Sequence, residues 1–444
     1  MRKNKIRILH VAQAAGGVDR YIRMLLKYLD KEKFENILVC SQDFHEEDYK
    51  GLLDSFEQIE MTRAIGRTDL KAIKKVRALI KKYNPDIVYK GCIECGLCIK
   101  SCPALNSGEF KNKTLVGYAA TSQDITTSEN SSSGGIFALI AREFLRNNSW
   151  VIGAKMESDY CLKHVAINHI EELEGLQGSK YVQSNMDGII DKISELLSNG
   201  SQVLFSGTPC QVSGLKKAMK IKGIDVKNLV TIDIVCHGVP SPKFFREHVK
   251  FKYGKVSNIK FRHRTKHELN GYALGFQKSG NYKIIQPTNR DFYYACFSSQ
   301  VSLRESCYNC AYTTANRVGD ITLGDLSTHR LYDSYFKKDR ALSIVGVNTE
   351  RGKHLFGNLK NVDFIKADYL KECSVNAQMN HPTARPDERD NFYIALFQNG
   401  YSEKNADEYK YRYSFKENVK NWITLNTTPS FRNKLKKLLK SNEN

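Results

Sequence analysis

The sequence lacks any long hydrophobic run. Its longest apolar stretches, such as Ile37 to Cys40 and Ile232 to Cys236, are far shorter than the roughly 20 residues that a membrane-spanning helix needs. The apolar run near the start of the chain is also shorter than the apolar region of a signal peptide. We therefore predict a cytoplasmic protein, in which Ile6 to Val11 forms a first β-strand.

The sequence also lacks a G-x-G-x-x-G stretch, so a Rossmann-type dinucleotide site is not indicated. Acidic residues are in the minority, with 48 Asp and Glu against 68 Lys and Arg, which gives a net charge of +20. Because the basic residues are spread along the chain, we expect no nucleic acid partner. The run from Arg432 to Lys440 allows at most a peripheral contact with anionic lipid, and an ordinary solvated helix is the favoured alternative.

Cysteine, by contrast, occurs 12 times and clusters, which in a cytosolic chain indicates metal binding or redox work. The stretch GCIECGLCIKSCP has the spacing of a bacterial ferredoxin run. Zinc sites usually take two C-x-x-C pairs set well apart, so we predict a 4Fe–4S cluster. Only one such run is present, and the fourth cysteine of a run can bind a second cluster, so the completeness of this site stays open. The predicted ligands are Cys92, Cys95, Cys98 and Cys102.

A second set of cysteines occurs further along the chain. Cys210 and Cys236 each follow a predicted strand, and Cys307 and Cys310 form a C-x-x-C loop. Ligands of parallel α/β sheets collect beyond the carboxyl ends of the strands, so these four thiols could hold a second cluster. The alternative is that Cys210 and Cys236 are small buried apolar residues, and the sequence leaves both possibilities open.

Three loops rich in glycine and serine have the composition of anion-binding loops. The first opens a predicted helix at Ile136, where free N–H groups and the helix dipole favour phosphate. Each loop alone is weak evidence for a cofactor site, since SSSGG is also a good helix cap. Together the three loops fit a flavin dinucleotide, FAD. His237, beside Cys236, could tune a flavin or pass a proton, but a histidine at a strand end that bonds only backbone is the favoured interpretation. The predicted cofactor-binding residues are Ser132, Ser133, Gly134, Gly135, Lys180, Tyr181, Ser206, Gly207, Thr208, Pro209 and His237. We name no catalytic residue.

The order of predicted elements indicates an α/β protein. Residues 1–90 alternate strands and helices and predict half of a Rossmann-like parallel sheet. A ferredoxin-like 4Fe–4S segment follows over residues 91–109. Residues 110–380 predict one mixed α/β flavin-binding domain, and residues 381–444 a helical basic tail.

Residues from about 91 to 380 resemble the beta-subunit family of coenzyme F420 hydrogenase/dehydrogenase. The matching motifs occur in order and are GCIECGLCIKSCP, SSSGGIF, GSKYVQS, LFSGTPCQVSGL, TIDIVCHGVPSPK, and CYNC followed by DITLGD. The resemblance implies an iron–sulfur flavoprotein with FAD near the three loops. It also implies that Cys210, Cys236, Cys307 and Cys310 share a cluster. Members of this family usually begin with two ferredoxin runs, whereas this chain has one.

Residues 1–90 resemble the N-terminal half of GT-B glycosyltransferases of the family-4 type. The resemblance rests on KIRILHVAQAAGGVDRYIRMLLKYL and NPDIVY. The second domain, which holds the nucleotide sugar in that family, has no counterpart here. We therefore expect no glycosyl transfer from this segment.

These patterns favour an iron–sulfur flavin-dependent oxidoreductase, with one or two 4Fe–4S clusters and FAD. The expected partner is a redox protein or a deazaflavin, in a setting of polysaccharide biosynthesis. Two alternatives remain: a glycosyltransferase-related protein of polysaccharide biosynthesis, and a non-catalytic fusion remnant that docks to polysaccharide enzymes.

Overall fold

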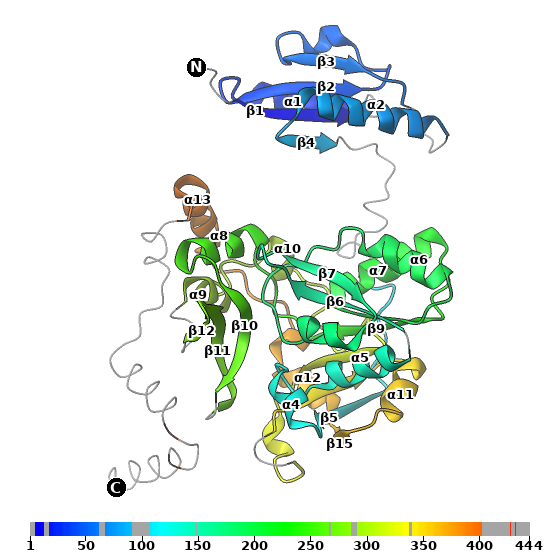
Figure 1. Ribbon diagram of the computed structural model, residues 1–444, viewed down its shortest axis with the longest axis vertical. Helices are drawn as coiled ribbons and strands as arrows, with labels where there is room; N and C mark the ends of the chain where they lie inside the picture. The colour runs from blue at the N-terminus through cyan, green and yellow to red at the C-terminus, as the bar shows by residue number, and fades with distance from the viewer. Residues whose placement is uncertain are drawn as a thin grey trace. The chain divides into compact units, whose positions relative to one another are not determined.

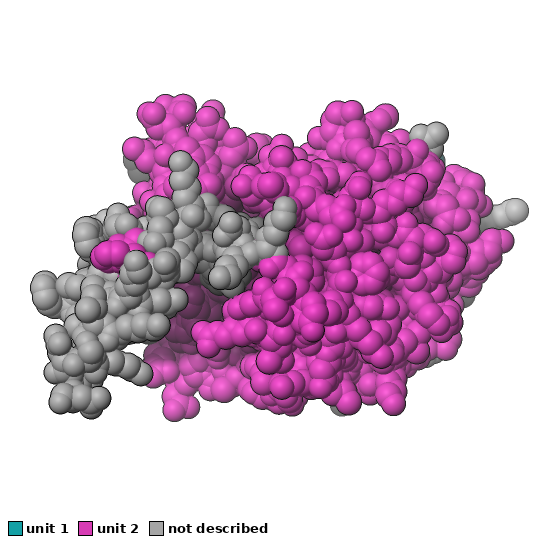
Figure 2. Space-filling view, turned by 90° about the horizontal axis from the view of Figure 1, so that it is seen from below, with its two compact units in different colours: residues 1–100 teal, residues 101–444 magenta. Residues whose placement is uncertain are grey.

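The computed structural model describes residues 5–12, 17–61, 67–90, 107–147, 149–265, 268–285, 291–336 and 340–401, together with Thr427 and Phe431. The chain divides into two compact units, residues 1–100 and residues 101–444 (Figure 1). Each unit has its own hydrophobic core, and Figure 2 shows one face of unit 2.

Unit 1 is built around a parallel sheet of four strands. Its elements are β1 (Ile6–Ala12), α1 (Gly17–Tyr28), β2 (Phe34–Cys40), the 3-10 helix η1 (Glu46–Tyr49), β3 (Ser55–Gln58), α2 (Arg67–Tyr83) and β4 (Ile87–Lys90). The strand order is β3-β2-β1-β4. Ile22 and Leu26 of α1 pack on one face of the sheet, and Val76 and Ile80 of α2 join the apolar cluster on the other face. Unit 1 is therefore half of a doubly wound fold, as the sequence predicts.

Unit 2 is built around a mixed sheet of eight strands. The strands are β5 (Val116–Ser122), β6 (Trp150–Met156), β7 (Leu162–Ile167), β8 (Val203–Gly207), β9 (Leu229–Ile234), β13 (Ile321–Asp325), β14 (Ser343–Val347) and β15 (Val362–Ala367). Their order is β15-β5-β14-β13-β9-β8-β6-β7. β6, β8, β9 and β13 pair in parallel. β5 and β13 are both antiparallel to β14, so β5 runs in the same direction as this parallel group.

Helices cover both faces of the eight-stranded sheet. They are α4 (Ile125–Glu129), α5 (Ile136–Arg146), η2 (Ile170–Leu176), α6 (Ile189–Ser198), α7 (Pro209–Lys222), α11 (Glu350–Gly357) and α12 (Tyr369–Val375). Successive side chains of β8 alternate between the faces, as the pleat requires. Leu204 packs with α5 and α11, while Val203 and Phe205 pack with α6 and α7.

A smaller antiparallel sheet stands beside the large one in unit 2 (Figure 1). It contains β10 (Ser257–Thr265), β11 (Glu268–Lys278) and β12 (Asn281–Ile285). The remaining elements are α8 (Pro242–Lys252), α9 (Phe292–Ser298), α10 (Glu305–Tyr308), η4 (His329–Leu331), η5 (Ala377–Met379) and α13 (Arg389–Asn399). An aromatic core that includes Phe244, Phe261, Tyr293 and Phe392 joins β10 to α8, α9 and α13.

Several strands differ from the sequence-based expectation. The apolar residues Ile59 to Met61 indicate a third strand in unit 1, and the structure places that strand a few residues earlier, at Ser55–Gln58. β5 was not predicted, because it carries small residues and ends in buried Thr121 and Ser122 instead of an apolar run. β15 was not predicted either, since it is an edge strand with exposed and half-buried side chains and therefore no alternating apolar pattern.

No helix in the described ranges is both long and apolar enough to cross a membrane. The predicted basic helix from Arg432 to Lys440 lies outside the described residues, apart from the neighbouring Phe431. The cytoplasmic location stays a prediction.

Candidate functional site

The candidate site lies at one edge of the eight-stranded sheet. β8 ends at Gly207 and β9 at Ile234, and because these strands are parallel they end at the same edge. β5 runs in the same direction and ends at Ser122, whose N–H donates to the carbonyl of Gly134 at 2.6 Å. The segment Ser131–Gly135, called the serine loop below, therefore lies at the same end of the sheet as the loops that follow β8 and β9. This edge is where ligands of α/β sheets bind.

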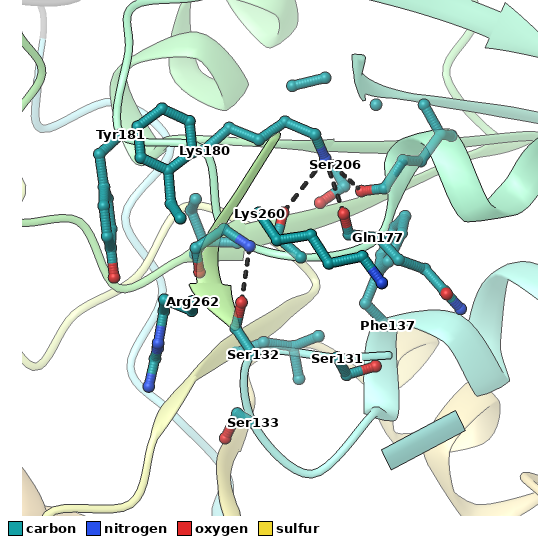
Figure 3. Close-up of a pocket in the computed structure, with 18 of the residues that line it drawn as sticks. Ser131, Ser132, Ser133, Phe137, Gln177, Lys180, Tyr181, Ser206, Lys260 and Arg262 are labelled. Carbon is teal, nitrogen blue, oxygen red and sulfur yellow. Dashed lines mark hydrogen bonds between the residues drawn. The ribbon is translucent and has the colours of Figure 1, made fainter. Parts of the chain in front are cut away.

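A cavity of about 3020 Å³ opens at this edge (Figure 3). A pocket for one drug-sized ligand measures about 300–1,000 Å³, so this cavity has room for a large cofactor. Two of the predicted cofactor-binding residues, Gly134 and Pro209, do not line it. The predicted residues that do line it are Ser132, Ser133, Gly135, Lys180, Tyr181, Ser206, Gly207, Thr208 and His237.

Hydrogen bonds tie the serine loop to the neighbouring segments. The Ser132 hydroxyl accepts from the N–H of Ser179 at 2.6 Å and so joins the first predicted loop to the second (Figure 3). The Ser133 hydroxyl donates to the carbonyl of Leu342 at 2.9 Å. The loop is thereby held in one conformation at the cavity wall.

The two glycines of the serine loop serve packing and the start of a helix. A Cβ on Gly134 would lie 2.4 Å from the carbonyl oxygen of Ala120, so only glycine fits there. Gly135 has a φ of 83° and is the N-cap of α5, with no side-chain cap. The first N–H groups of α5 therefore face the loop without a capping side chain, which favours an anion at this point.

Lys180 is held by backbone carbonyls. Its Nζ donates to the carbonyl oxygens of Leu176, Gln177 and Gly178 at 3.2, 2.8 and 3.1 Å (Figure 3). Burial lowers the pKa of Lys180 to about 7, and the three carbonyl acceptors act against that shift because they favour the charged form. The Lys180 side chain thus caps the carbonyl groups at the end of η2, and its three N–H donors are all taken by these carbonyl oxygens.

His164 lies behind the loop that follows β8. Its Nε2 is 3.1 Å from the carbonyl oxygen of Ser206, and its ring stacks on Phe205 with centroids 5.3 Å apart. Burial lowers the pKa of His164 to about 4, and the nearby charge of Lys180 adds to this shift. His164 is therefore neutral at pH 7, with the proton on Nε2, where it donates to Ser206.

Aromatic side chains form a flat wall of the cavity. The Tyr181 ring stacks on Phe297 at 4.5 Å and meets Tyr294 edge to face at 5.8 Å. His237 packs edge-on against Phe297, and its Nδ1 is 2.8 Å from the side-chain nitrogen of Gln378. Burial lowers the pKa of His237. The ring of His237 therefore contacts a side chain, that of Gln378, whereas the sequence-based interpretation was a ring bonded only to backbone.

The fold brings the second set of cysteines into one neighbourhood. Cys210 lies in the first turn of α7, Cys236 follows β9, Cys307 is on α10 and Cys310 comes just after it. Burial raises the pKa of the Cys236 thiol, and the thiols of Cys210, Cys307 and Cys310 raise it further. Such mutual effects require the four thiols to lie close together. Cys210 and Cys236 also line the cavity.

Hydrogen-bond donors point at several of these sulfurs. Backbone N–H groups of Gly238 and Val239 act on Cys236 and Cys307 and oppose the rise in their pKa values. The Thr208 hydroxyl is 3.1 Å from Sγ of Cys210. Donors of this kind stabilise the negative charge on thiolate ligands and tune cluster potentials.

The segment that follows the first cysteine run braces the loop of the second set. Asn112 and Arg317 exchange two backbone hydrogen bonds of 2.7 and 2.9 Å, and Lys111 Nζ donates to the carbonyl of Ala311 at 2.6 Å. Glu109 pairs with two lysines of α7, the helix that begins beside Cys210.

Within the described ranges, no group of three or more His, Cys, Asp or Glu side chains has the spacing needed to hold a metal ion. The four thiols lie in one neighbourhood, but their sulfur atoms are not spaced to bind one metal ion together. In a cubane cluster each thiolate binds a different iron atom, so the sulfurs lie further apart than around one ion. The first predicted cluster site lies outside the described residues; its predicted ligands are Cys92, Cys95, Cys98 and Cys102.

Three side chains of the cavity were missed by the sequence reasoning. Lys260 and Arg262 reach it from β10, with Lys260 Nζ 3.5 Å from Asn130 Oδ1 and Arg262 paired to Asp325 at 2.7 Å. Basic residues are common in this chain, so these two gave no signal. His164 lies on a β-strand without any motif, and only the pairing of β7 in the sheet brings it to the site.

Residues 200–372 match the family model for the C-terminal part of the coenzyme F420 hydrogenase/dehydrogenase beta subunit. This match supports the beta-subunit resemblance over those residues. A solved chain of the F420-reducing [NiFe] hydrogenase complex from Methanosarcina barkeri is similar at 17% identity and a TM-score of 0.43, covering 61% of this chain and 91% of that chain. At this TM-score the likeness carries no argument about function. No curated protein matches the chain. The resemblance of residues 1–90 to glycosyltransferases stays a prediction.

Proposed function

We propose that this protein is an iron–sulfur flavoprotein oxidoreductase that passes electrons between a 4Fe–4S cluster, FAD and a deazaflavin or another acceptor. One observation carries the proposal: cysteines from three distant segments gather at the sheet edge where the three predicted loops line one cavity. The family match over residues 200–372 supports it, because that family is named for coenzyme F420 hydrogenase and dehydrogenase.

The donor set fits an iron–sulfur cluster. Cys210, Cys236, Cys307 and Cys310 offer four soft sulfur ligands, and a cubane takes four thiolates. The N–H groups of Gly238 and Val239 would stabilise the bound thiolates. When present, such a cluster supplies one-electron chemistry beside the cavity.

The cavity fits a flavin dinucleotide. The serine loop and the start of α5 offer donors for phosphate, and the rings of Tyr181 and Phe297 offer a flat wall. Flavin exchanges hydride with one partner and single electrons with another, which suits a site beside a cluster. Ser206, Thr208 and His237 are further cofactor contacts in this proposal, and Lys180 lines the same cavity.

The predicted cluster of the first cysteine run belongs to the same proposal, as an entry or exit point for electrons. The expected partner is a redox protein or a deazaflavin. A role beside polysaccharide-biosynthesis enzymes is proposed on the resemblance of residues 1–90.

Unit 1 favours a second candidate function. Its sheet is half of a doubly wound fold, similar to what a glycosyltransferase-related fusion would retain. In that case the chain is a glycosyltransferase-related protein or a non-catalytic remnant that acts as a scaffold. Neither version needs iron or flavin.

The deciding experiment is anaerobic purification of the full chain with iron, sulfide and flavin measured together. We expect about four or eight iron atoms per chain, for one or two cubane clusters, with matching sulfide and bound FAD. Cys236→Ala should lose about four iron atoms, whereas the control Cys161→Ala, a half-buried thiol outside the set, should lose none. Colourless protein with zinc or no metal would refute the proposal.

A further inference from the structure

Lys260 brings a positive charge to the serine loop from a different sheet. It lies on β10, and its side chain extends into the cavity above Ser131 and Phe137 (Figure 3). Its Nζ is 3.5 Å from Oδ1 of Asn130, the residue directly before the serine loop. The side chain is exposed, and the ion pairs of the described residues include none with Lys260.

Three other cations of the cavity wall are already engaged. Lys180 donates to three carbonyl oxygens, and Arg262 forms an ion pair with Asp325. Arg340 donates to the carbonyls of Ser122 and Gln123. A ligand phosphate at the serine loop would have to break one of these contacts to pair with any of the three. Lys260 can pair with it after a rotation of its own side chain.

The serine loop offers neutral donors but no charge of its own. The Ser132 hydroxyl accepts from Ser179 N–H, which leaves its own proton available to donate. The first N–H groups of α5 add further donors. A lysine as a point charge beside backbone and hydroxyl donors is a common way to bind phosphate.

We propose that Lys260 supplies the charge that binds a phosphate of FAD at the serine loop, and that the cavity thereby selects phosphorylated flavins over riboflavin. The inference rests on the proposed function for the presence of FAD. In this inference the cation that pairs with the phosphate comes from β10, and it is not the predicted cofactor-binding residue Lys180. It also makes the small sheet one of the two walls that hold the cofactor.

The test compares FAD with riboflavin, which has the same ring system but no phosphate. Full-length protein is stripped of flavin under anaerobic conditions and titrated with each compound by flavin fluorescence. Lys260→Met should weaken FAD binding about tenfold or more, as expected for loss of a charge-assisted contact, and leave riboflavin binding unchanged. Lys260→Arg should retain most of the FAD affinity. The matched control is Lys283→Met, an exposed lysine on β12 that does not line the cavity.

Salt gives a second readout. FAD binding to the parent protein should weaken as ionic strength rises, and this dependence should be smaller in Lys260→Met. Equal FAD affinity in Lys260→Met and the parent would overturn the inference and leave the proposed function standing. Equal losses for FAD and riboflavin would also overturn it, since they would indicate a disturbed cavity. A parent protein that binds neither flavin would overturn the inference together with the flavin part of the proposed function.

Discussion

Arg317 donates from Nε and Nη2 to one carboxylate oxygen of Asp233, at 3.1 and 2.8 Å, and both side chains are buried. The second oxygen of Asp233 accepts from the N–H groups of Val318 and Gly319 at 2.9 and 2.7 Å. Asp233 lies on β9, three residues before Cys236, and Arg317 follows the C-x-x-C loop. The pair therefore fixes the position of one cysteine segment relative to the other.

Asp233→Asn should destabilise unit 2 strongly, because it leaves the guanidinium of Arg317 buried without its counter-charge. The expected loss is about 3–5 kcal/mol in the free energy of unfolding, measured by urea denaturation. The control is Glu350→Gln, which removes an exposed partner of Lys353 and should cost less than about 1 kcal/mol. Similar losses in both variants would show that the Arg317–Asp233 pair has no special role.

Gly134→Ala tests the packing of the serine loop. The new methyl group would lie 2.4 Å from the carbonyl oxygen of Ala120 and 3.0 Å from the backbone nitrogen of Ser343, so backbone must move. We expect a loss of about 1–3 kcal/mol in stability, seen as a lower melting temperature. Gly357→Ala is the control, since a Cβ there meets nothing within 4 Å. An unchanged melting temperature for Gly134→Ala would mean that the loop adapts freely.

His164 should make the protein sensitive to mild acid. Its pKa is about 4 in the folded protein and near 6.5 when unfolded, so between these values only the unfolded state binds the proton. Stability should therefore fall as the pH drops from about 6.5 to 4. His164→Gln keeps an N–H for the Ser206 carbonyl but does not titrate, so its unfolding free energy should fall less steeply in this window. The control His354→Gln, on the exposed side of α11, should behave like the parent in urea denaturation at each pH.

Thr208→Val tests the hydroxyl beside Cys210. The variant keeps the shape of the side chain but removes a hydroxyl 3.1 Å from the sulfur. Once the sulfur is a thiolate, the hydroxyl is the only one of the two groups that can donate, and it then turns from its second partner, Oε1 of Gln211. Under the proposed function it should retain iron and show a more negative cluster potential, because a donor to sulfur stabilises the reduced cluster. Thr208 also caps α7, so a stability loss of about 1 kcal/mol is expected as well. Thr208→Ser keeps the hydroxyl and should keep the parent potential in a redox titration followed by EPR. An unchanged potential in Thr208→Val would contradict this role.

The sequence predicts the strands whose side chains are apolar on both faces. β6 and β8 are parallel strands covered by helices. Their apolar runs predict strands at Trp150 to Met156 and Val203 to Ser206, within a residue of the actual ends. The placement of Cys210 and Cys236 beyond strand ends followed from the same reasoning. Motif spacing also pointed to the three loops, which line one cavity.

Other parts of the site depend on tertiary pairing that leaves no local pattern. Lys260 faces the serine loop only because the small sheet stands beside the large one, and nothing near position 260 marks this. Lys180 is predicted as a cofactor-binding residue, but no local rule indicates that the end of η2 would offer it three carbonyl oxygens. The sequence does not predict β5, because small and hydroxyl side chains take the place of apolar ones. The serine loop nevertheless hydrogen-bonds to the end of this strand.

The order of strands in the large sheet has a practical consequence for protein expression. The segment that matches the family model, residues 200–372, begins after β5, β6 and β7. β15 pairs with the rest of that sheet through β5 alone, so a fragment cut to these limits would leave β15 without its neighbour. Such a fragment would also lack Glu109 and Asn112, which contact α7 and Arg317. A truncation of unit 2 that keeps these contacts therefore has to start before Glu109, because the boundary of sequence similarity is not a boundary of independent folding.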